Sequence, residues 1–497
     1  MNKLMKEHLF YLEPKPGLSL QVQIKEMLVS AILDGHLAPG DPLPSNRKLA
    51  QTLKVSRNTV VFVYEKLLEE GYIVSRERQG HFVNPEVQSV ILDVDAILSR
   101  SAEVTSTTRA ADWESRFRID PQPPAHIKMT KQWRHCRYSF IYGQLDPELF
   151  PVADWRECVR QASSNLLTRD WLGDSADADD PMLIEQLRSR VLPRRGIRCG
   201  SDEILVTLGT QQSLYMLAQL LASPGVRVGL ENPGYADVRK NFELVNADIV
   251  PLSIDVEGVV VNQALESCDY VYVTPSHQAP TTVTMSMERR KALLQSAELH
   301  DQIIIEDDYE NEINFHGHPA PALKSLDHGN RVIYVGSLSK TLSPGLRIGF
   351  MVGPAELINK ARALRHLMLR HPPANNQRAL ALFLAGGYHD TLLRRLTQTY
   401  RERSECLMAA LQQYLPEMVI SESTGGSSLW VEGPEDLDLQ ALQERALRNS
   451  LFFEIGEPLF FDDSPKKNCF RLGYSSIKTE DIEPGIKLLA ELIHCRH

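Results

Sequence analysis

Hydrophobic positions in the N-terminal part of the chain follow helical spacing and then change to short β-like runs. Ser45 and Ser56 stand where N-caps are expected, and Gly71 stands where the last of these helices should end. Proline and glycine residues separate the first helix from the second. The elements predicted here are, in order, helices over 20–33, 46–53 and 57–70 and strands over 72–75 and 81–83.

Farther along the chain, short runs of β-branched residues alternate with helical segments. This alternation is typical of an α/β domain, in which helices cover both faces of a mostly parallel sheet. In such sheets, ligands bind where the strands end at their carboxyl termini. The predicted strands are 203–208, 226–230, 270–274, 302–306 and 331–336, and the clearest helices are 212–222 and 288–299.

The composition is that of a globular protein. The chain has 497 residues, 43% of them hydrophobic and 24% charged, which excludes a fibre and a largely disordered chain. The length predicts about two to four domains. We expect no membrane span and no secretory signal, since no long apolar run occurs. Seven cysteines without a CxxC pair predict reduced thiols in a cytoplasmic protein, with neither zinc nor disulfides.

The charge is unevenly distributed between two parts of the chain. The net charge is −10, and residues 1–84 carry +2 while the remainder carries −12. We call residues 17–84 the head and residues 136–497 the body. Residues 85–135 hold few periodic apolar segments and are predicted to be a linker. The negative net charge argues weakly against a nucleic-acid partner, but the slightly basic head on an acidic body is an asymmetry that separates the two parts.

The predicted elements of the head have the order of a winged helix-turn-helix. Several polar and basic residues stand at the predicted helix N-termini and at the turn between the two strands, where they can meet phosphates and base edges. The alternative is a helical adaptor domain with solvated arginines. The candidate DNA-binding residues are Arg47, Arg57, Asn58, Thr59 and Gly80.

The segment LPSNRKLAQTLKVSRNTVVFVYEKLLEEGYIVSRERQGHFV (43–83) resembles the DNA-binding domain of the GntR family of bacterial repressors. The resemblance covers about residues 17–84 and implies double-stranded operator DNA as a partner. It also implies that the five residues above occupy the family's DNA-contacting positions.

Candidate chemistry in the body stands just after the predicted strands. Thr210 and Gln211 open a helix after the first strand and could bind an anion, although such turns are also common packing features. Tyr235 follows the second strand and could stack on a ring. Taken singly, a tyrosine here is more often a core or loop residue.

The last two strands are followed by acids and by a lysine. Asp307, within Glu306-Asp307-Asp308-Tyr309, could meet a protonated pyridine nitrogen, since a buried carboxylate needs a cation or strong donors. The alternative is that all three acids are solvated. Lys340 lies among hydroxyls and could form a Schiff base with an aldehyde, unless it is simply solvated. Ser337 and Arg347 could hold a phosphate dianion. The glycine spacing of a Walker A loop is absent.

Together these strand ends offer a phosphate seat, a stacking ring, an acid and a lysine, the set that pyridoxal phosphate requires. The body resembles the aspartate-aminotransferase fold (fold type I), and with the head it resembles the MocR subfamily of GntR regulators. The matching segments include ENPGYADVR, IIEDDYENE, GSLSKTLSPGLRIGF and FRLGYSS. The resemblance implies a Schiff base at Lys340 and cofactor contacts from Thr210, Gln211, Tyr235, Asp307, Tyr309, Ser337, Ser339, Lys340 and Arg347.

The same resemblance implies that Arg471, in FRLGYSS, binds the carboxylate of an amino-acid-like effector. Judged from the sequence alone, the alternative is that Arg471 is a surface or strand-edge arginine. Two segments depart from the family pattern. Ala279 and Thr282 stand where aminotransferases carry the asparagine and the glycine of Asn-Pro-Thr-Gly, and Leu172 stands where a tyrosine is usual. With these departures we still expect cofactor binding, but they argue against efficient turnover.

The predicted function is therefore a transcriptional regulator that binds pyridoxal phosphate and responds to an amino compound or to the cofactor itself. The resemblance also implies a head-to-tail homodimer. The alternative is an active aminotransferase with an attached DNA-binding domain, and sustained transamination would distinguish it. A body that has lost its cofactor is disfavoured, because Lys340, Asp307 and Arg347 are all present.

Overall fold

The computed structural model describes residues 10–11, 17–87, 111–119, 133–174, 177–315, 320–338, 340–421, 424–461 and 467–494. Its contacts divide the chain into two compact units, Met1–Arg116 and Phe117–His497, and we describe each by itself. Of the predicted linker, residues 88–110 and 120–132 lie outside the described part of the chain.

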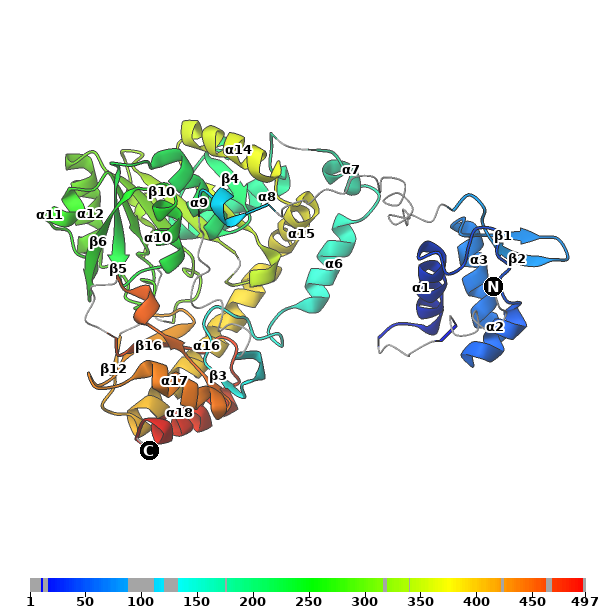
Figure 1. Cartoon of the computed structure of the whole chain (residues 1–497). Coiled ribbons are helices and arrows are strands. Elements are labelled where there is room, and N and C mark those ends of the chain that lie inside the picture. Colours follow the sequence, from blue (N-terminus) through cyan, green and yellow to red (C-terminus); the bar gives the residue numbers. More distant parts are fainter. Residues whose placement is uncertain are drawn as a thin grey trace. The chain divides into compact units, whose positions relative to one another are not determined.

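The first unit contains three helices followed by a two-stranded hairpin (Figure 1). Ser45 and Ser56 cap the second and third helices, since their hydroxyls accept hydrogen bonds from the backbone N–H groups of Lys48 at 3.3 Å and Thr59 at 3.1 Å. The predicted caps are thus confirmed, and the boundaries agree to within one residue. The elements are α1 (Leu20–Leu33), α2 (Asn46–Leu53), α3 (Arg57–Glu69), β1 (Ile73–Arg76) and β2 (Gly80–Val83).

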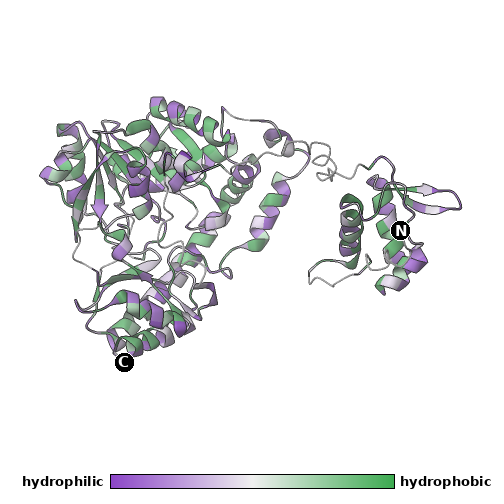
Figure 2. Cartoon of the chain, in the orientation of Figure 1, coloured by the Kyte–Doolittle hydropathy of each residue, from purple (hydrophilic) through white to green (hydrophobic). Residues whose placement is uncertain are grey.

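The helices of both units carry hydrophobic and hydrophilic residues in the same element (Figure 2), and in the head the apolar faces form one core. Tyr64 of α3 is buried in this core, and its hydroxyl donates a hydrogen bond to the Pro44 carbonyl at 2.7 Å. Val22 of α1 is 41% exposed, whereas the neighbouring Gln23 is buried and donates a hydrogen bond to the Leu18 carbonyl. The helix packs on a face turned slightly from the one its sequence suggests.

The second unit is built on an eight-stranded sheet with the order β4-β11-β10-β9-β8-β5-β6-β7. Five neighbouring strands, from β10 to β6, are mutually parallel, while β11 is antiparallel to both β10 and β4, and β7 is antiparallel to β6. The predicted mostly parallel sheet is confirmed. The strands are β4 (Ile204–Thr207), β5 (Arg227–Asn232), β6 (Asp248–Asp255), β7 (Gly258–Val259), β8 (Tyr270–Val273), β9 (Ile303–Asp308), β10 (Val332–Ser337) and β11 (Gly349–Val352).

Helices cover both faces of this sheet (Figure 1). On one face, Tyr272 and Ile305 pack with the first set of helices, and on the other Val271 and Ile304 pack with the second set. Adjacent residues of one strand thus enter opposite cores, as the two-residue period requires. The first set is α9 (Thr210–Leu221), α10 (Ala236–Glu243) and α14 (Ala355–Leu369), and the second is α11 (Gln263–Glu266), α12 (Met287–Leu299) and α13 (Leu323–Leu326).

The C-terminal part of the body forms a smaller sheet with the antiparallel order β12-β13-β16-β15. These strands are β12 (Val419–Ile420), β13 (Ser428–Glu432), β15 (Glu454–Ile455) and β16 (Cys469–Gly473), while β14 (Leu451–Phe452) pairs with β3 (Tyr138–Ser139). The remaining helices are α6 (Val152–Ala162), α7 (Thr168–Trp171), α8 (Pro181–Gln186), α15 (Ala374–Ala385), α16 (Tyr388–Tyr414), α17 (Leu439–Arg448) and α18 (Thr479–His494).

Candidate functional site

The predicted site residues of the body follow strands that end at one edge of the large sheet. In the parallel pair of β9 and β10, Val335 lies opposite Asp307 and Gly336 opposite Asp308. The chain that leaves β10 therefore begins next to the acids that end β9. Because these parallel strands share a direction, the segments after them converge at this edge.

The three consecutive acids that end β9 are all buried, so the alternative that they are solvated is wrong. Glu306 accepts hydrogen bonds from the backbone N–H groups of Leu323 and Lys324, both at 2.8 Å. Asp308 pairs with the Arg195 guanidinium at 2.7 Å and accepts a hydrogen bond from the Tyr334 hydroxyl. Two of the three acids thus have protein partners that satisfy them.

Asp307 is the acid that remains available. Its Oδ2 accepts a hydrogen bond from the Tyr272 hydroxyl at 2.9 Å, whereas its buried Oδ1 has no hydrogen-bond partner among the described residues. Burial raises the pKa of Asp307 to about 7, against the opposing effect of the Tyr272 hydrogen bond. A cation placed at Oδ1, such as a protonated ring nitrogen, would remove this penalty.

Lys340 points at an aromatic ring that sequence reasoning did not select. Its Nζ lies 4.2 Å from the centroid of the Tyr142 ring, and a Cβ on the neighbouring Gly143 would come within 2.5 Å of that Nζ. Gly143 has a φ of +74°, so glycine is needed there for both space and conformation. Burial lowers the pKa of Lys340, although nearby carboxylates, with Glu310 the strongest of them, act in the opposite direction. Lowering this pKa favours the neutral, nucleophilic amine.

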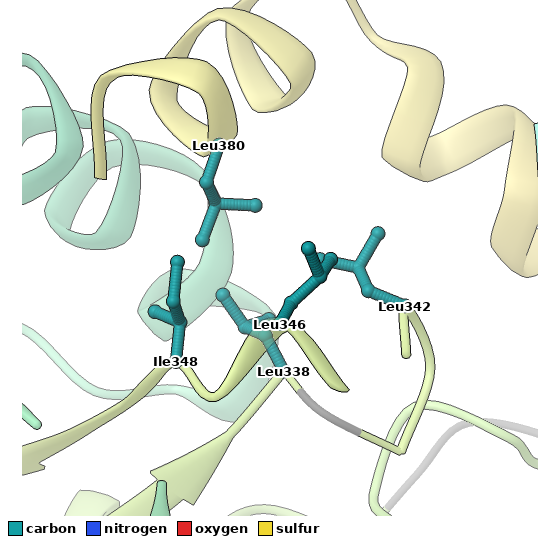
Figure 3. Close-up of a pocket in the computed structure, with 5 residues that line it drawn as sticks. All are labelled: Leu338, Leu342, Leu346, Ile348 and Leu380. Carbon is teal, nitrogen blue, oxygen red and sulfur yellow. The ribbon is translucent and has the colours of Figure 1, made fainter. Parts of the chain in front are cut away.

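Apolar packing fixes the segment that carries Lys340. Leu338 and Leu342 flank the lysine in sequence, and they line a small void together with Leu346, Ile348 and Leu380 of α15 (Figure 3). Every side chain drawn there is a hydrocarbon, so the void offers no polar group to a ligand. The side chains around it are buried in the core of the body and hold the segment by apolar contacts.

The start of α9 and Arg347 form a place for an anion. Gly209, the N-cap of α9, has a φ of +95°, and a Cβ there would lie 3.4 Å from an Arg347 guanidinium nitrogen. The guanidinium therefore lies close to the helix N-terminus, where Thr210 and Gln211 stand in the first turn. A helix N-terminus together with an arginine suits a phosphate. Ser337 ends β10, and Ser339 lies outside the described residues.

Tyr235 contacts Gln211 in the first turn of α9 and is influenced by the charge of Asp307. The Tyr235 hydroxyl donates hydrogen bonds to Gln211 at 3.2 Å and to Asp237 at 3.0 Å. The charge of Asp307 contributes to the raised pKa values of both Tyr235 and Tyr309, although burial is the larger cause in each. The predicted ring-binding residues are therefore neighbours of the acid with the free oxygen.

The segment that lacks the asparagine and glycine of the aminotransferase pattern keeps a defined structure. The Gln278 side-chain amide donates hydrogen bonds to the Pro233 carbonyl at 2.9 Å and to Glu231 at 3.2 Å, and its oxygen accepts one from the Thr281 hydroxyl. Thr282 has a φ of +65°, a value that favours glycine. The loop keeps the glycine-like backbone with a threonine. Leu172, in the second departing segment, is 72% exposed.

The guanidinium of Arg471 is largely buried. The alternative interpretation of Arg471 as a surface arginine is therefore wrong. The Arg471 Cζ lies 3.8 Å from the Tyr142 centroid, so the cations of Arg471 and Lys340 contact the same ring. Its Nε and Nη2 both bond to Glu454 Oε2, at 2.9 and 2.8 Å. The sequence analysis did not predict that this arginine already has a carboxylate partner.

The candidate DNA-binding residues are on the surface of the head. Arg47 is exposed in the first turn of α2, and Arg57 and Asn58 are exposed in the first turn of α3. The Thr59 hydroxyl lies 2.8 Å from the Ser56 hydroxyl, next to the cap. Gly80 is exposed at the hairpin turn with a φ of +103°.

Sequence reasoning missed Tyr142, Gly143, Glu310 and Glu454. The first two lie in FIYGQLDPELFP (140–151), a segment that also resembles the family and to which the sequence analysis assigned no role. Glu310 lies two residues after Asp308, the last acid of β9. Its place in the sequence, just after this strand, could have marked it as a candidate site residue. Glu454 left no signal, because its pairing with Arg471 depends on the fold of the small sheet.

Two families match the chain. Residues 20–83 match the bacterial regulatory proteins of the gntR family, and residues 153–489 match aminotransferase class I and II. Among the described residues no helix is long and apolar enough to cross a membrane, and no group of histidine, cysteine or acidic side chains that could hold a metal ion was found in that part of the chain.

Curated relatives carry both parts. The chain is 38% identical to the HTH-type transcriptional regulator TauR of Rhodobacter capsulatus, over 97% of this chain and 98% of that protein. It is 32% identical to the probable rhizopine catabolism regulatory protein MocR of Rhizobium meliloti, over 94% and 92%. The body is similar to a kynurenine aminotransferase of Pyrococcus horikoshii solved in complex with PMP, with a TM-score of 0.70, 28% identity and coverage of 78% of this chain and 96% of that chain.

Proposed function

Because the chain belongs to the MocR-type GntR transcriptional regulators, whose body is an aminotransferase class I and II domain, we propose that it binds pyridoxal phosphate at Lys340 and that an amino compound acting there alters its binding to operator DNA. The observation that carries the proposal is the combination of a lysine amine packed against the Tyr142 ring with a buried Asp307 oxygen that lacks a partner among the described residues.

Pyridoxal phosphate, when bound, supplies an aldehyde carbon that exchanges one amine for another. Support for it comes from the family and from the similar aminotransferase of Pyrococcus horikoshii, which was solved with PMP. The residues present also fit the group: Asp307 offers a free carboxylate oxygen for a ring nitrogen, and Gly143 leaves room beside the lysine Nζ.

In this proposal each residue has a simple task. Lys340 presents a neutral amine to the aldehyde, and Asp307 holds the proton on the ring nitrogen. Tyr235 stacks on the ring and Tyr309 binds its phenolic oxygen. The residues that hold the phosphate are Thr210, Gln211, Ser337, Ser339 and Arg347.

The head binds double-stranded DNA through α3, with the exposed Arg57 and Asn58 at its N-terminus in the major groove and Arg47 near the backbone. The hairpin turn at Gly80 would reach the adjacent groove. We further propose a head-to-tail homodimer in the cytoplasm, which would bind two spaced DNA half-sites.

The test of the cofactor is an absorption spectrum of the full chain incubated with pyridoxal phosphate and then freed of excess. We expect a visible band in the wild type and its loss in Lys340→Ala. Lys324→Ala is the matched control, because Lys324 is an ion-paired lysine of α13 and should leave the band unchanged. A wild type that stays colourless, or a band of equal strength in Lys340→Ala, would overturn the proposal.

A second assay separates the regulator from an aminotransferase. The loaded chain is incubated with an amino acid and a keto-acid acceptor, and the new keto acid is quantified. Ala279 cannot supply the side-chain amide of the usual asparagine, so we expect at most about one turnover per chain. Sustained turnover would favour the alternative of an active enzyme.

A further inference from the structure

Helix α3 of the head carries an exposed aromatic ring among its polar surface residues. The side chain of Phe62 keeps 44% of its surface exposed. It is the only exposed phenylalanine, tyrosine or tryptophan among residues 17–84, all of which the structure describes. The other three in this stretch, Tyr64, Tyr72 and Phe82, are buried or half-buried. Single exposed apolar residues are common, so the position of this ring has to show whether it has a partner.

Helical geometry places Phe62 on the same outer face of α3 as Asn58. The opposite face of the helix is buried in the core of the head and consists of Val60, Val63, Tyr64 and Leu67. Asn58 and Phe62 are four residues apart, so they lie about 40° apart around the helix axis and about 6 Å apart along it. Both are exposed. A ligand that contacts Asn58 on this face therefore also meets the phenyl ring.

The charges along α3 indicate which part of this face attracts DNA. The helix begins at Arg57, and a helix N-terminus favours phosphate. Near the other end, Lys66 pairs with Glu69 at 2.6 Å, so this cation is already neutralised. The attraction for phosphates is therefore concentrated at the N-terminal half of α3, which includes Phe62.

A phenyl ring can recognise only one of the groups that base pairs present in the major groove. It has no hydrogen-bond donor or acceptor, whereas the bases present ring-nitrogen and oxygen acceptors, amino donors and, on thymine, a C5-methyl group. Contact with the methyl group removes apolar surface of both partners from water. Contact with an acceptor or an amino group would bury that group without a hydrogen bond, which is unfavourable. The ring thus favours thymine and disfavours the other bases.

Resting on the DNA binding proposed above for the head, we infer that Phe62 reads the C5-methyl group of a thymine in the operator. Asn58, on the same face, would contact a neighbouring base, since asparagine can form two hydrogen bonds with adenine. Phe62 is then a specificity-determining residue, because it has no group that binds the phosphates, which supply most of the sequence-independent affinity.

The experiment removes single methyl groups from the DNA. The full chain first selects a binding site from a random-sequence pool, and each thymine of this site is then replaced in turn by deoxyuridine, which lacks only the C5-methyl group. Affinities are measured by fluorescence anisotropy at one salt concentration. For the wild type we expect at least one thymine whose replacement weakens binding about fourfold, the effect of losing one buried methyl group.

Three variants test the assignment to Phe62. Phe62→Ala should bind the thymine and deoxyuridine forms of this position equally well, and Phe62→Gln, which replaces the ring with an amide, should do the same. Val22→Ala is the matched control, because Val22 is apolar and 41% exposed but belongs to α1. It should keep the full difference. Circular dichroism reports whether each variant is folded, and the two substitutions of Phe62 keep the test valid if one of them is not.

Each outcome has a distinct meaning. An equal methyl effect in the wild type and in the Phe62 variants, or a selected site in which no thymine methyl group contributes, would overturn this inference and leave DNA binding by the head intact. If the Phe62 variants keep the methyl effect but change the oligomeric state of the chain, the ring contacts another protein chain, and the inference is again overturned. A wild type that selects no DNA would contradict the proposed function and this inference together.

Discussion

At the scale of single residues, three neighbouring acids show how environment separates structural from chemical roles. Glu306 is satisfied by the N-terminus of α13 and Asp308 by Arg195 and Tyr334. Asp307 has only the Tyr272 hydroxyl and keeps one buried oxygen without a partner among the described residues. Its charge is therefore destabilising until a cation arrives.

Asp307→Asn should stabilise the cofactor-free chain at alkaline pH. Burial raises the pKa of Asp307 from 3.8 to about 7, so the folded chain binds this proton more tightly than the unfolded chain does. The wild type consequently loses stability from this group as the pH rises between those two values, and the loss persists above them. The asparagine, which still accepts from Tyr272, should gain on the order of a few kcal/mol at pH 8. Urea unfolding at pH 5 and pH 8 measures this difference, which should be smaller at pH 5 because only part of the interval between the two pKa values has then been crossed.

Asp308→Asn is the matched control for this prediction. It removes the charge partner of the buried Arg195, so it should lower the free energy of unfolding at pH 8 by about 3 kcal/mol. A gain for both variants would mean that burial alone, without the difference in partners, governs these acids. The Asp307→Asn chain should also bind pyridoxal phosphate more weakly.

Thr282→Gly should also stabilise the chain. Thr282 is 5% exposed, has a φ of +65°, and its hydroxyl has no hydrogen-bond partner among the described residues. A β-branched residue is strained in this backbone region, so we expect a gain of about 1 kcal/mol in the free energy of unfolding. Thr281→Gly should be destabilising instead, because it removes the hydrogen bond to Gln278 at 2.6 Å. Equal losses in both variants would show that Thr282 is unstrained.

At the scale of elements, residues close in sequence made much of the fold predictable. Helix α3 begins at the predicted residue because Ser56 provides a local cap, and β9 is evident from consecutive isoleucines buried on both faces. Strand β11 was missed. It is a four-residue strand, antiparallel to both neighbours. The described residues between β10 and β11 form no α-helix, so the alternation of helices and strands in the sequence does not predict β11.

The residues of the candidate site also differ in whether a local sequence pattern could identify them. Asp307 and Lys340 could be found because each follows a recognisable strand, whereas Tyr142 and Glu454 reach the site from the two ends of the body. Tyr142 contacts Lys340, which is far away in sequence, and Glu454 pairs with Arg471 through the register of two neighbouring strands. Pairings of this kind depend on the packed fold and leave no local pattern.

Helix α3 should carry DNA recognition at its N-terminus. Arg57→Ala should lower the affinity for DNA roughly tenfold to a hundredfold and reduce the salt dependence of binding by about one released counterion. The matched control is Lys66→Ala at the other end of the helix, where the lysine pairs with Glu69, and its effect should be small. Fluorescence anisotropy with DNA selected by the full chain from a random-sequence pool measures both. An equal loss for the two variants would indicate attraction by overall charge instead of contact by α3.

At the scale of the whole molecule, the account requires that two separately folded units be coupled. The head has its own core, and the body holds the Lys340 site within its large sheet and its small sheet. An amine can change DNA binding only if it interacts differently with the two arrangements of the protein. Lys340 follows a strand of the large sheet and Arg471 belongs to the small sheet, and both contact Tyr142, so an amine bound at Lys340 would act on both parts of the body.

Coupling between the Lys340 site and the head is tested most directly by the affinity of the pyridoxal-phosphate-loaded full chain for its selected DNA, measured with and without an amine that alters the visible band. We expect the amine to change the affinity of the wild type by at least about fivefold and to leave that of Lys340→Ala unchanged. An equal response in the two proteins, or an unchanged affinity in a wild type whose band has shifted, would contradict this coupling.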